Sequence, residues 1–142
     1  MKKIYYLALV ALVGVAMSSC SMLNPKQEFQ LSDLQGLWLE NNTQHYVRFT
    51  TEKSDEASYL YGREWNEAED VFEEDLLPYG NGWFKYKFET NGNLTEIHLM
   101  DNGGAEIPKV YVVTVLTDTQ LSYYEKDQTS SKFSFSKQVQ SK

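Results

Sequence analysis

The residue types that most often build reactive sites are scarce in this chain. His45 and His98 are its only histidines, and no third ligand accompanies either at the spacing of a metal site. Strand alternation predicts that His45 points inward together with Val47 and Phe49. The same rule predicts that His98 points outward with Glu96, so that the two imidazole rings do not share a site. We therefore expect no metal and no cofactor.

Catalytic motifs are missing from the sequence as well. It contains no Gly-x-Ser-x-Gly nucleophile elbow, no phosphate-binding loop and no dinucleotide fingerprint. Paired carboxylates of the kind that hydrolyse glycosides are the one catalytic alternative, because the chain is rich in acidic residues and only their positions in space reveal such a pair. We expect a protein that is not an enzyme.

Cys20 is the only cysteine, and the residues ahead of it define its chemistry. Lys2 and Lys3 precede an uncharged apolar run over residues 4–17, and two serines lead into the cysteine. A positive flank, a short apolar core and a small-residue exit are the parts of a secretory signal. The apolar run is too short to span a bilayer, which needs about 20 apolar residues. This segment resembles the signal of bacterial lipoproteins, which is cut ahead of the cysteine.

The resemblance implies a lipid anchor. Residues 1–19 would be the signal peptide, and Cys20 would carry a diacylglyceryl thioether and an acylated amino group, with chains such as palmitate. Several acyl chains, at about 0.8 kcal/mol per buried methylene, hold a protein stably in a membrane. Residues 20–30 would be the lipidated tether. They lack the acidic run of surface-exported lipoproteins, so we expect an outer-membrane anchor facing the periplasm. An ordinary secretory signal and an uncleaved anchor are the alternatives.

Composition excludes further kinds of site and partner. With Cys20 acylated, the mature chain has no thiol, which excludes disulfides, thiolate catalysis and cysteine-based zinc sites. The net charge of −7 makes the chain a poor binder of nucleic acid, so we expect no nucleic-acid partner. The membrane would be reached through the lipid on Cys20. The length suits a single domain with a sizeable core.

Residues 31–142 carry an all-β pattern. After one helical turn over 31–35, alternation of apolar and polar residues predicts eight strands, at 36–40, 43–50, 58–64, 83–89, 93–100, 107–116, 120–125 and 132–137. Asn91-Gly92 predicts a two-residue hairpin turn in which both residues have positive φ. Short turns favour an up-and-down antiparallel meander that closes into a barrel and so removes its edges. A two-sheet sandwich is the alternative.

These elements resemble a known family. A helical turn, then Gly36-Leu37-Trp38 at the head of strand one, then eight meandering strands ending in an aromatic one, is similar to small lipocalin-like bacterial lipoproteins. The resemblance implies a lipocalin-like barrel in which Trp38 plugs the closed end. The last predicted strand runs almost to the end of the chain, as in the shorter relatives that lack a C-terminal helix.

The connection between strands three and four does not follow the pattern of short turns between strands. Acidic residues dominate it, and Ala68, Val71, Phe72 and Leu76 recur at helical spacing. We predict a short acidic amphipathic helix over 67–77, inserted between these strands. It either covers the sheet or serves as a lid over the barrel mouth. A calcium site is a third option, although the spacing is not that of an EF-hand.

Aromatic residues supply the candidate ligand site. Ten are expected to face the barrel interior: Trp38, Phe49, Tyr59, Tyr61, Phe84, Tyr86, Phe88, Tyr123, Phe133 and Phe135. They either fill the core or line a pocket, and the tyrosine hydroxyls favour a pocket. We expect a cavity lined by Tyr61, Tyr86, Phe88 and Tyr123.

The leading hypothesis is therefore a non-enzymatic envelope lipoprotein that binds a small apolar or amphiphilic ligand. A filled barrel that docks an envelope protein partner is the alternative, and a carboxylate-based hydrolase is a third.

Overall fold

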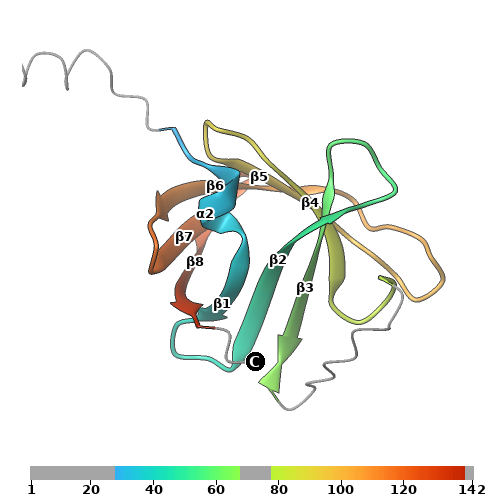
Figure 1. Cartoon of the computed structure of the whole chain (residues 1–142), viewed down its shortest axis with the longest axis horizontal. Coiled ribbons are helices and arrows are strands. Elements are labelled where there is room, and N and C mark those ends of the chain that lie inside the picture. Colours follow the sequence, from blue (N-terminus) through green and yellow to red (C-terminus); the bar gives the residue numbers. More distant parts are fainter. Residues whose placement is uncertain (1–27, 68–77, 140–142) are drawn as a thin grey trace, which may run out of the picture.

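The computed structural model describes residues 28–67 and 78–139. They form eight antiparallel strands that close into a barrel in chain order, with β1 paired to β8 (Figure 1). This confirms the predicted all-β, up-and-down barrel and excludes the two-sheet sandwich. The elements are α2 (Leu31–Leu34), β1 (Gly36–Glu40), β2 (His45–Lys53), β3 (Leu60–Asn66), β4 (Trp83–Phe88), β5 (Asn93–His98), β6 (Lys109–Leu116), β7 (Gln120–Glu125) and β8 (Gln128–Gln138).

The predicted acidic helix over 67–77, with its candidate lid residues Val71, Phe72 and Leu76, lies almost entirely outside the described residues. The short helix that the structure does describe, α2, precedes β1. No helix in the two described ranges is long and apolar enough to cross a membrane.

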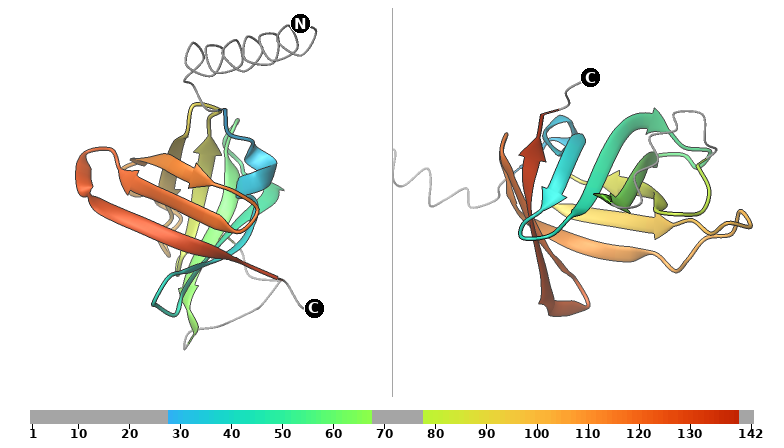
Figure 2. Two further views of the ribbon diagram at one scale, coloured as in Figure 1. Left: turned by 90° about the vertical axis from the view of Figure 1, so that its left-hand side faces the viewer. Right: turned by 90° about the horizontal axis from the view of Figure 1, so that it is seen from below.

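The barrel has two different ends because its strands alternate in direction. The closed end holds α2, the start of β1, the β4–β5 turn and the end of β8, whereas the opposite end, the mouth, holds the β1–β2 turn and the starts of β4 and β6. Strand β8 is longer than predicted, and its hairpin with β7 extends past the neighbouring strands (Figure 2). The charged side chains that face the interior lie in the mouth half.

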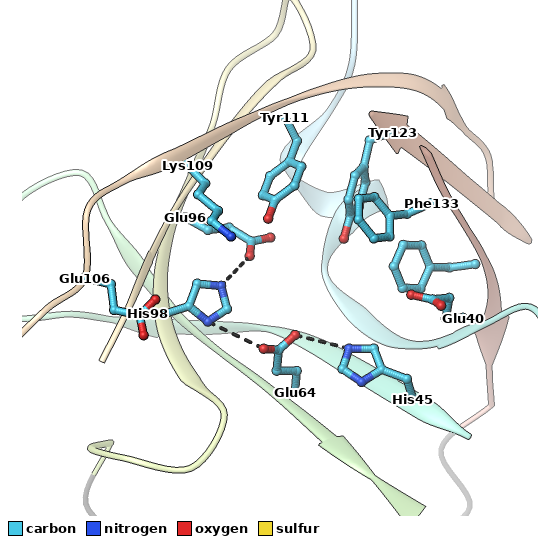
Figure 3. A pocket seen from close by; sticks show the side chains of 11 residues that line it. Glu40, His45, Glu64, Glu96, His98, Glu106, Lys109, Tyr111, Tyr123 and Phe133 are labelled. Atoms are coloured by element: carbon cyan, nitrogen blue, oxygen red, sulfur yellow. Dashed lines mark hydrogen bonds and ion pairs between the residues drawn. The ribbon is translucent and has the colours of Figure 1, made fainter. Parts of the chain in front are cut away.

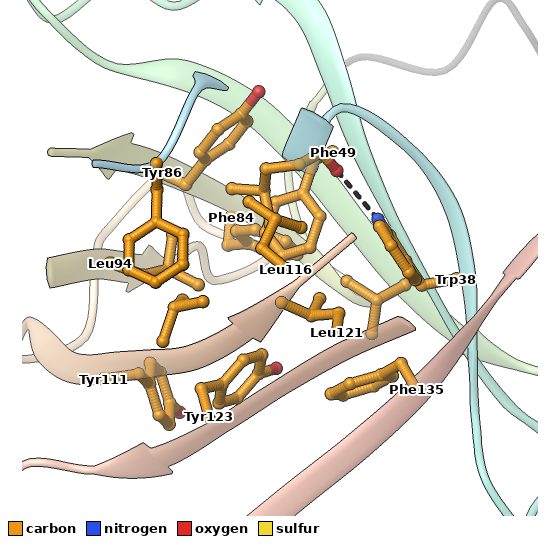
Figure 4. Close-up of a cluster of buried hydrophobic side chains, with 14 residues drawn as sticks. Trp38, Phe49, Phe84, Tyr86, Leu94, Tyr111, Leu116, Leu121, Tyr123 and Phe135 are labelled. Carbon is orange, nitrogen blue, oxygen red and sulfur yellow. Dashed lines mark hydrogen bonds between the residues drawn. The ribbon is translucent and has the colours of Figure 1, made fainter. Parts of the chain in front are cut away.

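Trp38 packs at the closed end, as the lipocalin resemblance implies. Its side chain is fully buried, and its indole Nε1 donates a hydrogen bond of 2.7 Å to the carbonyl oxygen of Leu34 in α2 (Figure 4). The ammonium of Lys137 lies 4.6 Å from the Trp38 ring centroid and donates to the carbonyl oxygen of Gln35 at 2.8 Å. One helical turn, one indole and one lysine therefore cover this end.

The core fills the closed half of the barrel. Phe49 meets Tyr86 edge to face, with ring centroids 5.0 Å apart, and Phe84 packs edge to face on Phe49 at 5.8 Å. Figure 4 shows these rings with Leu94, Leu116 and Leu121, which come from β5, β6 and β7. Four of the predicted lumen residues are thus packing residues in a solid core: Trp38, Phe49, Phe84 and Tyr86.

The packed part of the chain starts earlier than predicted. Phe29, which the sequence assigned to the tether, is buried in the core and lies 6.2 Å from the ring of Phe88. Its backbone N–H donates to the carbonyl oxygen of Thr90 at 2.9 Å. The chain therefore joins the barrel at the closed end, beside the β4–β5 turn.

The β4–β5 turn differs from the predicted two-residue hairpin. Glu89 N–H donates to the carbonyl oxygen of Asn93, and Gly92 N–H donates to that of Glu89, both at 2.9 Å, which closes a loop of three residues. Gly92 has φ of 102°, whereas Asn91 does not have positive φ. Only the glycine adopts the left-handed conformation, as in a type I turn followed by a bulge.

Candidate functional site

The two histidines lie in one site, contrary to the prediction from strand alternation. In β5, Glu96 pairs with Tyr86 and His98 pairs with Phe84, and both partners belong to the core. The imidazole ring of His98 stacks on Phe84 with centroids 5.1 Å apart. Glu96 and His98 therefore point into the barrel, and the expectation that they point outward was wrong.

The outer face of β5 explains the error. Ile97 and Leu99 occupy that face, and both are only 9% exposed. The outer face of this part of β5 is therefore apolar, whereas Glu96 and His98 follow the apolar Leu94 on the inner face. Alternation finds two faces but does not tell which one is the interior when both are covered.

Four side chains from three strands form an acid–histidine chain across the cavity (Figure 3). His45 Nε2 lies 3.1 Å from Glu64 Oε2, which confirms that His45 faces inward. The other oxygen of Glu64 lies 3.5 Å from His98 Nδ1, and His98 Nε2 lies 3.0 Å from Glu96 Oε1. Glu64 thus bridges the two imidazole rings, and His98 bridges the two carboxyl groups.

Glu96 is the most buried member of the chain. The residue is 5% exposed, and its Oε2 atom has no hydrogen-bond partner among the described residues. Two tyrosines line the cavity beside it, and Figure 3 shows the hydroxyls of Tyr111 and Tyr123 directed to its interior. A buried acceptor without a donor is uncommon, because leaving it unpaired costs free energy.

The environment shifts the pKa of each group. Hydrogen bonding to Glu64 raises the pKa of His45. Burial opposes the charged form of His98, but the hydrogen bond to Glu96 and the surrounding carboxylates outweigh it and raise that pKa. Burial likewise opposes ionisation of Glu64, but the two histidines lower its pKa. Burial raises the pKa of Glu96, and His98 offsets this only in part.

The contact of 3.0 Å between His98 Nε2 and Glu96 Oε1 is short enough for one proton to form a hydrogen bond between them. Both ring nitrogens of His98 face carboxyl oxygens, so an imidazolium satisfies both by donating twice. Moving the proton from His98 Nε2 to Glu96 Oε1 keeps the same contact with the donor reversed.

A cavity of about 300 Å³ occupies the mouth half of the barrel. It is lined by Glu40, His45, Glu64, Glu96, His98, Glu106, Lys109, Tyr111, Tyr123, Phe133 and Phe135. Aromatic rings from β6, β7 and β8 make one wall, and the acid–histidine chain makes the other (Figure 3). Of the ten predicted lumen residues, Tyr123, Phe133 and Phe135 line this cavity.

Three other predicted lumen residues lie elsewhere. Tyr61 is on the outer face of β3, where its ring meets Trp83 edge to face at 6.2 Å. Tyr59 lies under the ammonium of Lys87, 5.5 Å from its ring centroid, also outside the barrel. Phe88 packs against the core at the closed end. The predicted cavity lining was therefore right for Tyr123 and wrong for Tyr61, Tyr86 and Phe88.

Sequence reasoning missed the charged wall. Four of its residues carry no motif, namely Glu40, Glu64, Glu106 and Lys109. They meet only because the register brings β1, β3 and β6 to one interior and the β5–β6 loop adds Glu106. Within residues 28–67 and 78–139, no group of three or more histidine, cysteine or acidic residues is arranged to hold a metal ion.

Comparisons with known proteins give no relative, since no family model, no curated protein and no solved structure matches the chain. The eight-stranded up-and-down barrel is consistent with the lipocalin-like fold that the sequence resembles.

Proposed function

We propose that this chain is a lipid-anchored protein of the bacterial cell envelope that binds a small amphiphilic molecule in the mouth half of its barrel without catalysing a reaction. The observation that supports the proposal most is the cavity of about 300 Å³, with aromatic rings on one wall and titratable groups on the other. Pockets that bind small molecules have volumes of roughly 300–1,000 Å³, so the ligand is small.

Two features favour an amphiphilic ligand over a purely apolar one. Phe133 and Phe135 offer apolar surface to the body of a ligand, together with the ring of Tyr123. The opposite wall holds charged groups that an apolar molecule would desolvate without compensation, which is costly. A ligand with one polar end satisfies both walls.

The lipid anchor rests on the sequence ahead of the barrel. A basic and apolar signal leads directly into Cys20, the only cysteine in the chain. The proposed location is the outer membrane, facing the periplasm.

Native mass spectrometry of the protein extracted in mild detergent from its parent bacterium tests the proposal. A reproducible extra mass that disappears on denaturation supports an occupied barrel. An apo mass, together with a crosslinked envelope protein, would instead support the alternative in which the barrel docks a partner.

A further inference from the structure

The unpaired oxygen of Glu96 specifies the polar end of the ligand. We infer that this end is a protonated amine, and that one of its N–H groups donates to Glu96 Oε2 beside the hydroxyls of Tyr111 and Tyr123. The inference rests on the proposed function, because it assigns the ligand class of the same cavity.

The first step is that no donor of the described residues reaches Glu96 Oε2. Glu96 Oε2 is buried and has no partner in the described part of the chain, whereas Oε1 is held by His98. Lys109 pairs with Glu96 in the backbone register, but it is exposed and leaves Oε2 unsatisfied. A ligand that brings an N–H group removes the cost of this buried acceptor.

The second step concerns charge. Carboxyl groups reach the cavity from β1, β3, β5 and the β5–β6 loop, namely Glu40, Glu64, Glu96 and Glu106. The facing basic groups are Lys109, His45 and His98, and both histidines already contact carboxylates. A cation is therefore favoured over an anion, and a charge-assisted hydrogen bond is stronger than a neutral one.

The third step concerns the aromatic wall. Tyr111 and Tyr123 lie with ring centroids 4.9 Å apart, and Phe133 packs 5.5 Å from Tyr123. Ring faces attract cations within about 6 Å, and ring bodies cover apolar carbon. An amine on a short apolar stem satisfies the carboxyl group and the rings together.

Binding should also depend on pH. A cation at Oε2 favours ionised Glu96, so protonating this carboxyl group weakens binding. Because burial raises the pKa of Glu96, the weakening begins above 4.5, the ordinary value. The other titratable groups facing the cavity are Glu40, His45, Glu64, His98, Glu106, Lys109, Tyr111 and Tyr123.

Calorimetric titration of the full chain in nanodiscs of zwitterionic lipid tests the inference with three probes of similar size. These are 2-phenylethylamine, 2-phenylethanol and 3-phenylpropionate, each corrected for empty nanodiscs. At pH 7.5 we expect the amine to bind roughly tenfold or more tightly than the alcohol, and the carboxylate to bind least. Lowering the pH to 5 should weaken only the amine.

Glu96→Gln is the matched variant, because glutamine keeps an acceptor for His98 and removes the charge. It should lose the preference for the amine, whereas Glu52→Gln, which removes one carboxylate from an exposed position on β2, should keep it. Equal amine affinity in Glu96→Gln and Glu52→Gln would overturn the inference.

The wild-type probe series decides the question if Glu96→Gln does not fold. Preference for the alcohol or the carboxylate would overturn the inference and still support a ligand-binding barrel. Failure of all three probes, with no co-purified mass in native mass spectrometry, would overturn both proposals.

Discussion

Glu64 is the residue on which the polar half of the interior depends. It is the one described carboxylate that contacts both histidines, and its backbone N–H donates to the carbonyl oxygen of Gly82 at 2.8 Å. The side chain is one-third exposed, so solvent screens its charge in part. Its main effect is to hold His45 and His98 in fixed positions on the cavity wall.

Replacing Glu64 by glutamine should lower the pKa of both histidines, because each loses a facing negative charge. We expect a cost of about 1–3 kcal/mol in the free energy of unfolding. Titration of the two imidazole rings by NMR measures the first effect, and urea denaturation measures the second. Glu52→Gln is the control on an exposed position. Unchanged histidine pKa values would contradict the bridging role of Glu64.

Stability should also change with pH in a defined direction. His45 and His98 have raised pKa values, so their contribution is complete below about 6.5 and is lost as the pH rises through their folded-state values. Glu96, also raised, acts in the same direction, whereas Glu64, lowered, contributes above 4.5 and loses its contribution in acid. Urea midpoints should therefore be higher at pH 6 than at pH 8.5, and a steady rise over that range would refute this balance.

At the scale of elements, the sequence predicted where the strands lie. It did not always predict which face of a strand is turned to the barrel interior. Alternation in β4 placed Phe84 and Tyr86 inside correctly, because the lysines between them leave one clear apolar face. In β3 and β5 the rule failed, because Tyr61 and Ile97 are covered on the outer surface. The charged wall was not predictable, since it depends on register between strands that are distant in sequence.

Gly82, directly before β4, packs closely against the backbone of Glu64 in the site. Its φ is +81°, and an added Cβ would collide with the carbonyl oxygen of Glu64. Gly82→Ala should cost about 2–4 kcal/mol, because overpacking adds to the strain of positive φ. Gly103, at φ +83° with open space around it, is a matched control, and Gly103→Ala should cost only about 1 kcal/mol. Equal losses in thermal denaturation would contradict the collision.

At the scale of the whole molecule, the barrel divides into a packed half and a hollow half. The closed half contains α2, Trp38 and the aromatic core. The mouth half contains the cavity and nearly all the inward-facing charge. The sequence predicted the closed barrel, the helical turn and the place of Trp38, but not this division, since ten aromatic residues are compatible with either a filled or a hollow interior.

The proposed lipid anchor is tested on the whole chain. Cys20→Ala should remove the acyl acceptor, so that the protein leaves the membrane fraction or accumulates with its signal uncut. Fractionation with immunodetection measures the distribution, and Cys20→Ser is a conservative control that should behave in the same way. Retention of either processed variant on the membrane would contradict a lipid anchor.

The position of Phe29 bears on how the proposed lipid anchor would orient the barrel. The chain joins the fold at the closed end, and an extended stretch from residue 20 to residue 28 reaches at most roughly 30 Å. A lipid at Cys20 would therefore tether the barrel through its plugged base, with the opening at the other end. Cargo would then exchange with the aqueous compartment rather than directly with the leaflet that holds the anchor.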